Sequence, residues 1–424
     1  MKRDEAITYL YELSSLGWKL GLDKVRRMLA DLGDPHKKYR SIHIAGTNGK
    51  GSTSAITESI LRESGYATGL FTSPHLINVN ERIRINGVEI EMDALIEYIH
   101  RLKPYIDKYK CTFFESMTAI GFLAFAEHKI DVAVVEVGLG GRLDATNVIS
   151  PSFAIITDIE HDHTNLLGRS RKLIAAEKGG IIKKSLKVLT ASRYRDVLRT
   201  LREICLEQDA ELMQLHKIAN IENAVLKPEY NAFDLIYADE AFRELKLALI
   251  GAHQIQNAAL AISTACELRN VLTKIDRDAI YRGLRSVRWP GRLEVLADAP
   301  VTVVDVAHNP DAIRKTLKAV KQIFTYKRLI VLIGIVKKKN YRAMLKELAS
   351  HADMIVAVKP DTHRALSPVA ISRRARELNI PVKTMGTTAE GLEYAMNAAG
   401  SNDLILGVGS HYTVGEILQN MRRR

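Results

Sequence analysis

The chain has 424 residues, 46% hydrophobic and 26% charged, which is the composition of a globular protein with enough core for two or three domains. Its net charge of +12 favours acidic partners, but the basic runs lack interleaved aromatic residues, so we expect solvated surfaces and no nucleic-acid binding. Apolar runs too short for a bilayer, an N-terminus without a signal-peptide pattern and 3 isolated cysteines favour a cytoplasmic protein with reduced thiols.

The first informative segment is 41–53, SIHIAGTNGKGST, where an apolar strand enters a glycine-rich turn and then a helix expected over 52–64. The glycines allow a tight turn that directs backbone N–H groups at phosphate oxygens. Lys50 adds a positive charge, and the Ser52 hydroxyl is a candidate Mg²⁺ ligand. One extra glycine separates the lysine from the serine, and a plain glycine-rich turn is the alternative. The strand before and the helix after favour a nucleotide phosphate site.

Short apolar runs alternate with helical patterns through the first two thirds of the chain. The expected strands are 42–45, 68–72, 132–137, 154–157 and 188–190. The expected helices are 93–108, 113–128, 171–182, 194–208 and 254–269. This alternation predicts a doubly wound parallel sheet with helices on both faces. Residues 210–249 are weakly patterned and predict a few short strands.

Glu136 lies near the carboxyl end of an otherwise apolar strand. Ligands of open α/β sheets bind beyond those strand ends, so this carboxylate is a candidate Mg²⁺ ligand beside the phosphate loop. The alternative is an ion-paired strand residue. We favour the metal role because a charge inside an apolar run is costly without a strong partner.

The next strand opens into 159–168, where His163 is a candidate metal ligand and Asp162 a candidate partner that orients it. A lone histidine is more often structural, but this one follows the strand beside the proposed metal site. Glu177-Lys178, at the end of an expected helix, is an ordinary surface pair when taken alone.

A break at Arg288-Trp-Pro-Gly-Arg292 ends the first series of elements. A second series follows, with expected strands at 301–306, 329–335, 354–358, 381–384 and 404–408. The sequence therefore predicts an α/β protein with two doubly wound domains. These are a P-loop ATPase-type domain at 1–293 with the acceptor site, a linker at 294–298 and a smaller Rossmann-like domain at 299–424. The active site is expected in the cleft between them.

Several motifs occur in order along nearly the whole chain: Gly46-Thr-Asn-Gly-Lys-Gly-Ser52, Thr72-Ser-Pro-His75, Asn80-Glu-Arg-Ile83, Gly138-Leu-Gly-Gly-Arg-Leu-Asp-Ala-Thr-Asn147, Asp162-His-Thr164 and Asp305-Val-Ala-His-Asn-Pro310. With Glu136 they resemble the folylpolyglutamate synthase/dihydrofolate synthase group of the Mur ligase superfamily. The resemblance implies Mur ligase architecture. It also implies an ATP-dependent ligase that joins L-glutamate to dihydropteroate and to the glutamate tail of tetrahydrofolate through an acyl phosphate. Folylpolyglutamate synthase activity alone is the alternative.

The resemblance also implies the cofactors. Two Mg²⁺ ions would be held by Ser52, Glu136 and His163, with ATP as co-substrate. Lys178 would be carbamylated, which gives an anionic group that bridges to the metal. The family usually has Glu-Lys-Ala-Gly at this point, and Gly179 takes the place of the alanine.

The remaining site residues implied by the resemblance fall into three sets. The catalytic set is Lys50, Lys178 and His308. The ATP-binding set is Asn48, Gly49, Lys50, Gly51, Asn257, Arg292 and Asp305. The pteroate and folate set is Leu22, Asp23, Lys24, Val25, Ser73, Arg82, Thr112, Phe113, Phe114, Glu115, Leu143, Asp144 and Ala145. A flat pterin suits stacking on a phenylalanine, and we expect one of Phe113 and Phe114 to be core instead.

Two other classes of protein share parts of this pattern. A cell-wall precursor ligase would share the ATP domain, but only 45 residues precede Gly46, which we expect to be too few for a nucleotide-sugar domain. A nucleotide-dependent switch or nucleic-acid motor would share the phosphate loop and the basic charge, but not Lys178 or the second α/β domain. We therefore expect a monomeric enzyme that acts on small molecules, with neither a membrane nor nucleic acid as a partner.

Overall fold

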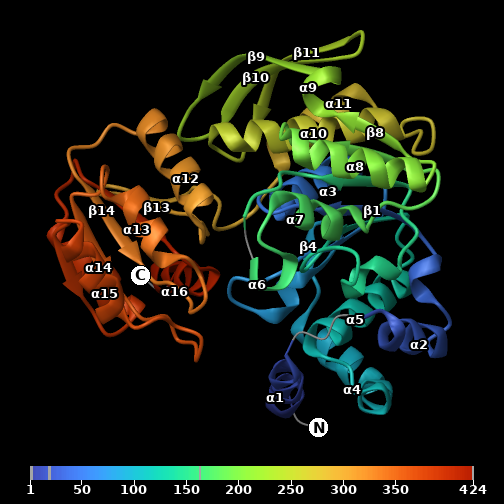
Figure 1. The fold of residues 1–424 in the computed structure, drawn as a ribbon, viewed down its shortest axis with the longest axis horizontal. Helices are drawn as coiled ribbons and strands as arrows, with labels where there is room; N and C mark the ends of the chain where they lie inside the picture. Colours follow the sequence, from blue (N-terminus) through green and yellow to red (C-terminus); the bar gives the residue numbers. More distant parts are fainter. Residues whose placement is uncertain (1–2, 18–20, 162–163, 423–424) are drawn as a thin grey trace.

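The computed structural model describes residues 3–17, 21–161 and 164–422 (Figure 1). Two α/β bodies lie side by side, the N-terminal one coloured blue to yellow and the C-terminal one orange to red. Each is built on a mostly parallel sheet, which confirms the predicted fold class. No helix within the described ranges is long and apolar enough to cross a membrane.

The N-terminal body is built on an eight-stranded sheet with the order β4-β3-β2-β5-β1-β6-β7-β8. Its strands are β1 Arg40–Ala45, β2 Thr68–Phe71, β3 Ile83–Ile85, β4 Val88–Glu89, β5 Val132–Glu136, β6 Phe153–Ile156, β7 Lys187–Thr190 and β8 Glu211–Gln214. All pairs from β2 to β8 are parallel, as the apolar runs predict. β3 and β4 add an antiparallel hairpin at one edge. The sequence does not predict this hairpin because both strands are very short and carry charged residues.

Helices cover both faces of this sheet because successive strand residues point in opposite directions. Val132 and Val134 share a core cluster with α3 and α10, whereas Ala133 and Val135 share one with α4 and α5. The helices of this body are α1 Arg3–Glu12, α2 Asp23–Asp31, α3 Lys50–Glu63, α4 Met92–Tyr109, α5 Phe113–Glu127, α6 Thr164–Leu167, α7 Arg171–Gly179, α8 Arg195–Glu207, α9 Leu215–Ile218, α10 Ala252–Leu268 and α11 Arg277–Ser286.

A separate antiparallel sheet extends the core of this body at the top of Figure 1. Its strands are β9 Ala219–Leu226, β10 Asn231–Tyr237 and β11 Glu240–Leu247, in the order β11-β10-β9. They are longer than the short strands expected for 210–249. Phe233, Leu235 and Leu245 are buried in the cluster that also holds the apolar face of α10.

The C-terminal body holds a six-stranded sheet with the order β12-β13-β17-β14-β15-β16. Its strands are β12 Glu294–Asp298, β13 Val301–Val304, β14 Leu329–Ile333, β15 Met354–Ala357, β16 Val382–Thr384 and β17 Leu404–Val408. Its helices are α12 Pro310–Ile323, α13 Tyr341–Leu348, α14 Pro368–Glu377, α15 Thr388–Ala398 and α16 His411–Arg422. The residues suggested as a linker form β12, which pairs antiparallel with β13 at the sheet edge. The chain therefore crosses between the bodies at 287–293, here called the hinge.

One segment of the N-terminal body packs against the apolar core of the other body. Leu76 and Ile77, in the connection between β2 and β3, pack on a cluster that includes Val306 and Val414. The approach to α16 is so close that a Cβ on Gly415 would lie 2.1 Å from the carbonyl oxygen of Leu76. The bodies are thus joined by packing as well as by the hinge.

Candidate active site

The loop between β1 and α3 has the geometry of a phosphate cradle. β1 lies between β5 and β6, the point of the sheet where the strand order reverses and where α/β folds bind ligands. Gly49 has a φ of +84°, a conformation that favours glycine. A Cβ on Gly49 would lie 2.5 Å from Oδ1 of Asn257, and one on Gly46 would lie 1.8 Å from Oγ1 of Thr157. The glycines therefore let α10 and the end of β6 approach the loop backbone.

The loop is held by the residues that follow β6. The Thr157 hydroxyl donates to the Asn48 carbonyl at 2.7 Å, and the Thr47 N–H donates to the Asp158 carbonyl at 2.7 Å. The Lys50 ammonium group donates to the Thr47 carbonyl at 3.3 Å. The sequence does not mark Thr157 as a site residue, because a threonine after a strand belongs to no motif.

Glu136 is a buried carboxylate at the carboxyl end of β5, an interior strand of the sheet, with 4% of its surface exposed. It accepts the Ser73 N–H at 3.0 Å. Burial raises the pKa of Glu136, and nearby cations oppose the shift. In decreasing order of effect these cations are Lys50, Arg292 and Arg82. A buried carboxylate at this strand end fits Mg²⁺, which prefers hard oxygen donors.

The other predicted metal ligands are only partly described. Ser52 lies in the first turn of α3 and is buried. His163 and its partner Asp162 lie outside the described residues. Within the described ranges no three His, Cys, Asp or Glu side chains form a metal-binding group. The predicted set relies instead on a serine hydroxyl and a modified lysine, so it stays a prediction.

Lys178, in the last turn of α7, lies against the phosphate loop. Its side chain is buried, and its ammonium group donates to the Gly46 carbonyl at 2.7 Å. It is therefore not the exposed half of a surface pair. The neighbouring Gly179 leaves room for Ile204 of α8, because a Cβ there would lie 2.5 Å from that side chain. An alanine at this position would therefore require the end of the Ile204 side chain to move.

Arg292 reaches the site from the hinge. Burial lowers the pKa of Arg292, and Asp305 and Glu136 oppose the shift. Asp305, after β13, accepts the Leu293 N–H at 3.0 Å and the Thr316 hydroxyl at 3.0 Å. Asp305 thus ties the end of the hinge to α12.

Three polar contacts join the phosphate loop region to the C-terminal body. Asn48 donates to the Asp311 carboxylate at 3.1 Å and accepts from Asn309 at 3.0 Å. Lys315 forms an ion pair with Asp158 at 3.2 Å. Asn309, followed by proline, is a readable helix start and does cap α12. Its contact across the bodies, like those of Asp311 and Lys315, has no signal in the sequence.

His308 follows β13, and its Nδ1 lies 2.9 Å from the Val306 carbonyl oxygen. Its ring centroid is 5.4 Å from that of His411, the first residue of α16. Burial, and then the neighbouring His308, lowers the pKa of His411. His411 was not among the predicted residues because a single histidine at a helix start belongs to no motif.

The predicted acidic residues of the pteroate end serve the local backbone. Thr112 and Glu115 form a capping box: the Thr112 N–H donates to the Glu115 carboxylate at 2.7 Å, and the Glu115 N–H donates to the Thr112 hydroxyl at 3.4 Å. Asp144 accepts the Leu139 N–H at 2.8 Å. It also accepts the N–H and the hydroxyl of Thr146, at 3.1 Å and 2.5 Å. These side chains therefore shape the start of α5 and the glycine loop after β5.

His43 of β1 supports the same loop from inside the sheet. It is fully buried, and its Nε2 lies 2.9 Å from Oγ1 of Thr146. The Thr146 hydroxyl already donates to Asp144, so Nε2 carries the proton and donates. Burial lowers the pKa of His43 to about 3. A neutral histidine thus buttresses the loop.

The two predicted stacking residues face different surroundings. Phe113 stacks on Tyr11 of α1 with centroids 5.8 Å apart and an interplanar angle of 10°. The Arg82 guanidinium lies 5.0 Å from the Phe113 ring. Phe114 covers the glycine loop, where a Cβ on Gly138 would lie 2.4 Å from its ring. Tyr11 was not predicted because nothing in the sequence of α1 points to a site.

The remaining pteroate candidates lie on α2 and in the glycine loop. Val25 is fully buried in the core. Lys24 donates to the Lys110 carbonyl at 2.7 Å. The others are at the start of α2 or flank Asp144: Leu22, Asp23, Leu143 and Ala145.

Comparisons with known proteins agree with this geometry. The Mur ligase middle domain matches residues 44–265, and the glutamate ligase domain of Mur ligases matches residues 291–411. A dihydrofolate synthase/folylpolyglutamate synthase of Bacillus subtilis (strain 168) is 35% identical over 427 residues, which cover 99% of this chain and 99% of that protein. The chain belongs to the Mur ligase family, in its dihydrofolate synthase/folylpolyglutamate synthase group.

Solved structures of this group have the same fold. Mycobacterium tuberculosis folylpolyglutamate synthase complexed with ADP is 28% identical, with a TM-score of 0.93 and coverage of 100% of both chains. The bifunctional folylpolyglutamate synthase/dihydrofolate synthase of Yersinia pestis, complexed with AMPPNP and a Mn ion, is 26% identical, with a TM-score of 0.87 and coverage of 100% of this chain and 98% of that chain. The resemblance seen in the motifs is confirmed, and the protein is an ATP-dependent ligase of this group.

Proposed function

We propose that this ligase joins L-glutamate to dihydropteroate and to the glutamate tail of tetrahydrofolate, with ATP converted to ADP and phosphate. One observation carries the proposal. Lys50, from the phosphate loop, and Arg292, from the hinge, both interact electrostatically with the buried carboxylate of Glu136 at the end of β5. The Bacillus subtilis relative carries both activities in its name, which supports both acceptors.

The proposed chemistry has two steps. The acceptor carboxylate oxygen forms a bond to the γ-phosphorus while the bond to the ADP oxygen breaks, which gives an acyl phosphate. The glutamate amine then attacks the carbonyl carbon, the bond to phosphate breaks, and the amine loses a proton. The positive N-terminus of α3 and the Lys50 ammonium group offset the charge on the transferring phosphoryl group. Asn257 of α10 lies close to Gly49, which supports its proposed contact with the nucleotide.

The oxygen donors present fit the implied magnesium. Ser52 and Glu136 would hold it, together with Lys178 in its carbamylated form and with His163. Bound Mg²⁺ supplies positive charge that stabilises the phosphate oxygens during transfer. The burial of Glu136 keeps its carboxylate away from bulk water, so its charge acts at close range.

Carbamylation of Lys178 belongs to the same proposal. The neutral amine forms a bond to the carbon of CO₂ and releases a proton, which leaves an anionic carbamate. The contact of Nζ with the Gly46 carbonyl supports the proposal, because it holds the amine beside the phosphate loop.

The acceptor is proposed to lie with its ring near Phe113 and Arg82. The Phe113 and Tyr11 pair presents an aromatic edge, and Arg82 adds a positive charge that suits a carboxylate-bearing substrate. Ser73 connects this acceptor end of the site to the phosphate end, because its N–H donates to the Glu136 carboxylate.

ADP release with each acceptor tests the function. Rapid ADP release should need both glutamate and an acceptor, and dihydropteroate and tetrahydrofolate should each gain one glutamate by mass. Extension of tetrahydrofolate alone would leave folylpolyglutamate synthase activity only. Glutamate-independent ATP turnover would contradict the ligase assignment. Oxygen-18 in the acceptor carboxylate should appear in the released phosphate, and its absence there would contradict the acyl phosphate.

A further inference from the structure

A cavity lies beside the hinge and shares Arg292 with the site described above. It has a volume of about 510 Å³ and is bounded by the β9–β10 turn, the end of β11, the end of α11 and the hinge. Four cationic side chains line it: Lys246, Arg285, Arg288 and Arg292. Two acidic side chains, Glu229 and Glu294, line it as well. The balance of charge is therefore positive.

The cations of this hinge cavity are only partly balanced by the protein, since Asp305 and Glu136 interact with Arg292 alone among the four. Among the residues that the structure describes, no ion pair within 4.0 Å involves any of the four. One nitrogen of Arg288 donates to the carbonyls of Arg285 and Val287, at 3.1 Å and 3.0 Å. Glu294 accepts the Gly291 N–H at 2.7 Å, so one of the acids serves the hinge backbone. Most N–H groups of these cationic side chains therefore face the cavity or the solvent.

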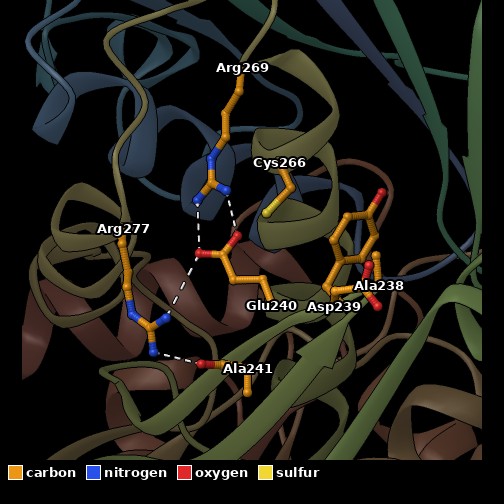
Figure 2. Close-up of a pocket in the computed structure, with 8 residues that line it drawn as sticks. Ala238, Asp239, Glu240, Ala241, Cys266, Arg269 and Arg277 are labelled. Carbon is orange, nitrogen blue, oxygen red and sulfur yellow. Dashed lines mark hydrogen bonds and ion pairs between the residues drawn. The ribbon is translucent and has the colours of Figure 1, made fainter.

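A cavity of the same volume, about 510 Å³, shows the opposite arrangement (Figure 2). There Glu240 lies between Arg269 and Arg277 and forms ion pairs with both. Arg277 also donates to the Ala241 carbonyl at 2.6 Å. Basic side chains at a cavity wall are thus ion-paired in one place, whereas Lys246, Arg285 and Arg288 at the hinge form no ion pair with the described residues. The hinge cavity therefore has positive charge available to a ligand.

We propose that the hinge cavity binds a phosphate group, carried by inorganic phosphate or by a small phosphorylated metabolite. Guanidinium groups offer paired N–H donors that match phosphate oxygens, and lysine adds a point charge. The volume is within the usual range for small-molecule sites and exceeds that of phosphate alone. The Tyr230 ring does not select the ligand, because it is already covered by Lys246. The Lys246 Nζ lies 5.3 Å from the centroid of that ring.

Two contacts connect the cavity to the catalytic site. Trp289 lines the cavity and packs on Gly51 of the phosphate loop, where a Cβ would lie 3.1 Å from the indole nitrogen. Arg292 lines the cavity and also belongs to the residues predicted to contact ATP. A phosphate in the cavity would compete for the charge of Arg292, so its binding should lower ATP turnover.

Calorimetric titration of the full chain tests the proposal. The protein is first saturated with AMPPNP and Mg²⁺, so that the phosphate loop is filled. Inorganic phosphate and ribose 5-phosphate are then titrated separately. Tighter binding of inorganic phosphate identifies the free ion as the ligand, and tighter binding of the sugar phosphate identifies a metabolite. Equal binding assigns recognition to the phosphate group alone.

The double variant Arg285→Gln/Arg288→Gln should weaken this binding at least tenfold. The matched control, Arg199→Gln/Arg202→Gln on the exposed face of α8, makes the same charge change and should bind as the unmodified protein does. Arg285→Gln alone, which removes no hydrogen bond of its own side chain, serves if the double variant unfolds. Absence of binding by both probes at millimolar concentration, or equal loss in both double variants, would overturn the proposal.

Discussion

The phosphate end and the pteroate end of the site use their carboxylates in opposite ways. Among the described residues Glu136 accepts one hydrogen bond and otherwise faces cations. Asp144 and Glu115 accept hydrogen bonds from the backbone of their own loop or helix start. Glu136 faces cations and is therefore available for chemistry, whereas Asp144, which accepts three hydrogen bonds, and Glu115, in the capping box, fix the local shape. Substitutions at the phosphate end should therefore lower turnover, whereas substitutions at the pteroate end should disturb local structure.

Glu136→Gln should give the largest effect. It keeps the side-chain volume and removes the charge, so turnover should fall by about 10³-fold or more. The thermal midpoint should hold or rise, because a buried charge is removed. Steady-state ADP release at limiting and saturating Mg²⁺ measures the effect. Glu115→Gln is the matched control at the pteroate end and should change turnover far less. Equal losses of turnover in the two variants would contradict the proposed difference between the phosphate end and the pteroate end.

Lys178→Ala should come next, with nearly complete loss of turnover. A short carboxylic acid such as acetate should restore part of it by filling the vacated anionic position. Lys178→Arg should stay inactive, because a guanidinium group does not take up CO₂. The measurements are ADP release with and without acetate, and the mass of the intact protein. Full activity in CO₂-depleted buffer would contradict carbamylation.

His43 should make stability depend on pH in a definite direction. Its folded pKa of about 3 lies below the ordinary 6.5, so between these values the unfolded chain binds a proton that the folded chain does not. Stability is therefore lost as pH falls below about 6.5, by about 2 kcal/mol at pH 5. His43→Gln removes this contribution. Urea unfolding at pH 7 and pH 5 should show a drop about 2 kcal/mol smaller in the variant, and an unchanged drop would refute it.

The capping box should give the smallest effect. Thr112→Ala should cost about 1 kcal/mol of stability and raise the KM for the acceptor. Thr387→Ala removes the same type of box from α15, far from the site, and should cost about the same without changing KM. Urea unfolding and acceptor saturation curves separate the two. An equal KM in both variants would show that the start of α5 does not shape the acceptor site.

The parts of the fold that could be predicted are those with a strong local pattern. The apolar runs of β1, β2, β5, β6 and β7 are confirmed, because buried parallel strands are nearly continuous in apolar residues. The β3–β4 hairpin and β12 were not predicted, because they are edge elements with exposed charged residues. Local sequence does not encode a strand that depends on a distant neighbour.

The residues of the site were likewise predictable only where a local motif contains them. The phosphate loop is readable because its glycines, lysine and serine lie within one short motif. Thr112-x-x-Glu115 is equally readable as a capping box, yet the resemblance directed attention to the pterin instead. The Asn48 contacts with Asp311 and Asn309 join residues more than 250 positions apart, and no local pattern predicts them.

The packing of Leu76 and Ile77 on α16 has a consequence for the covalent connection between the bodies. A chain cleaved in the hinge should remain one particle, since apolar side chains from one fragment pack against the core of the other. Either fragment produced alone would expose that surface and would be prone to aggregate. Continuity of the peptide backbone at the hinge is therefore dispensable for holding the bodies together, and mixing the two fragments should reconstitute the assembly.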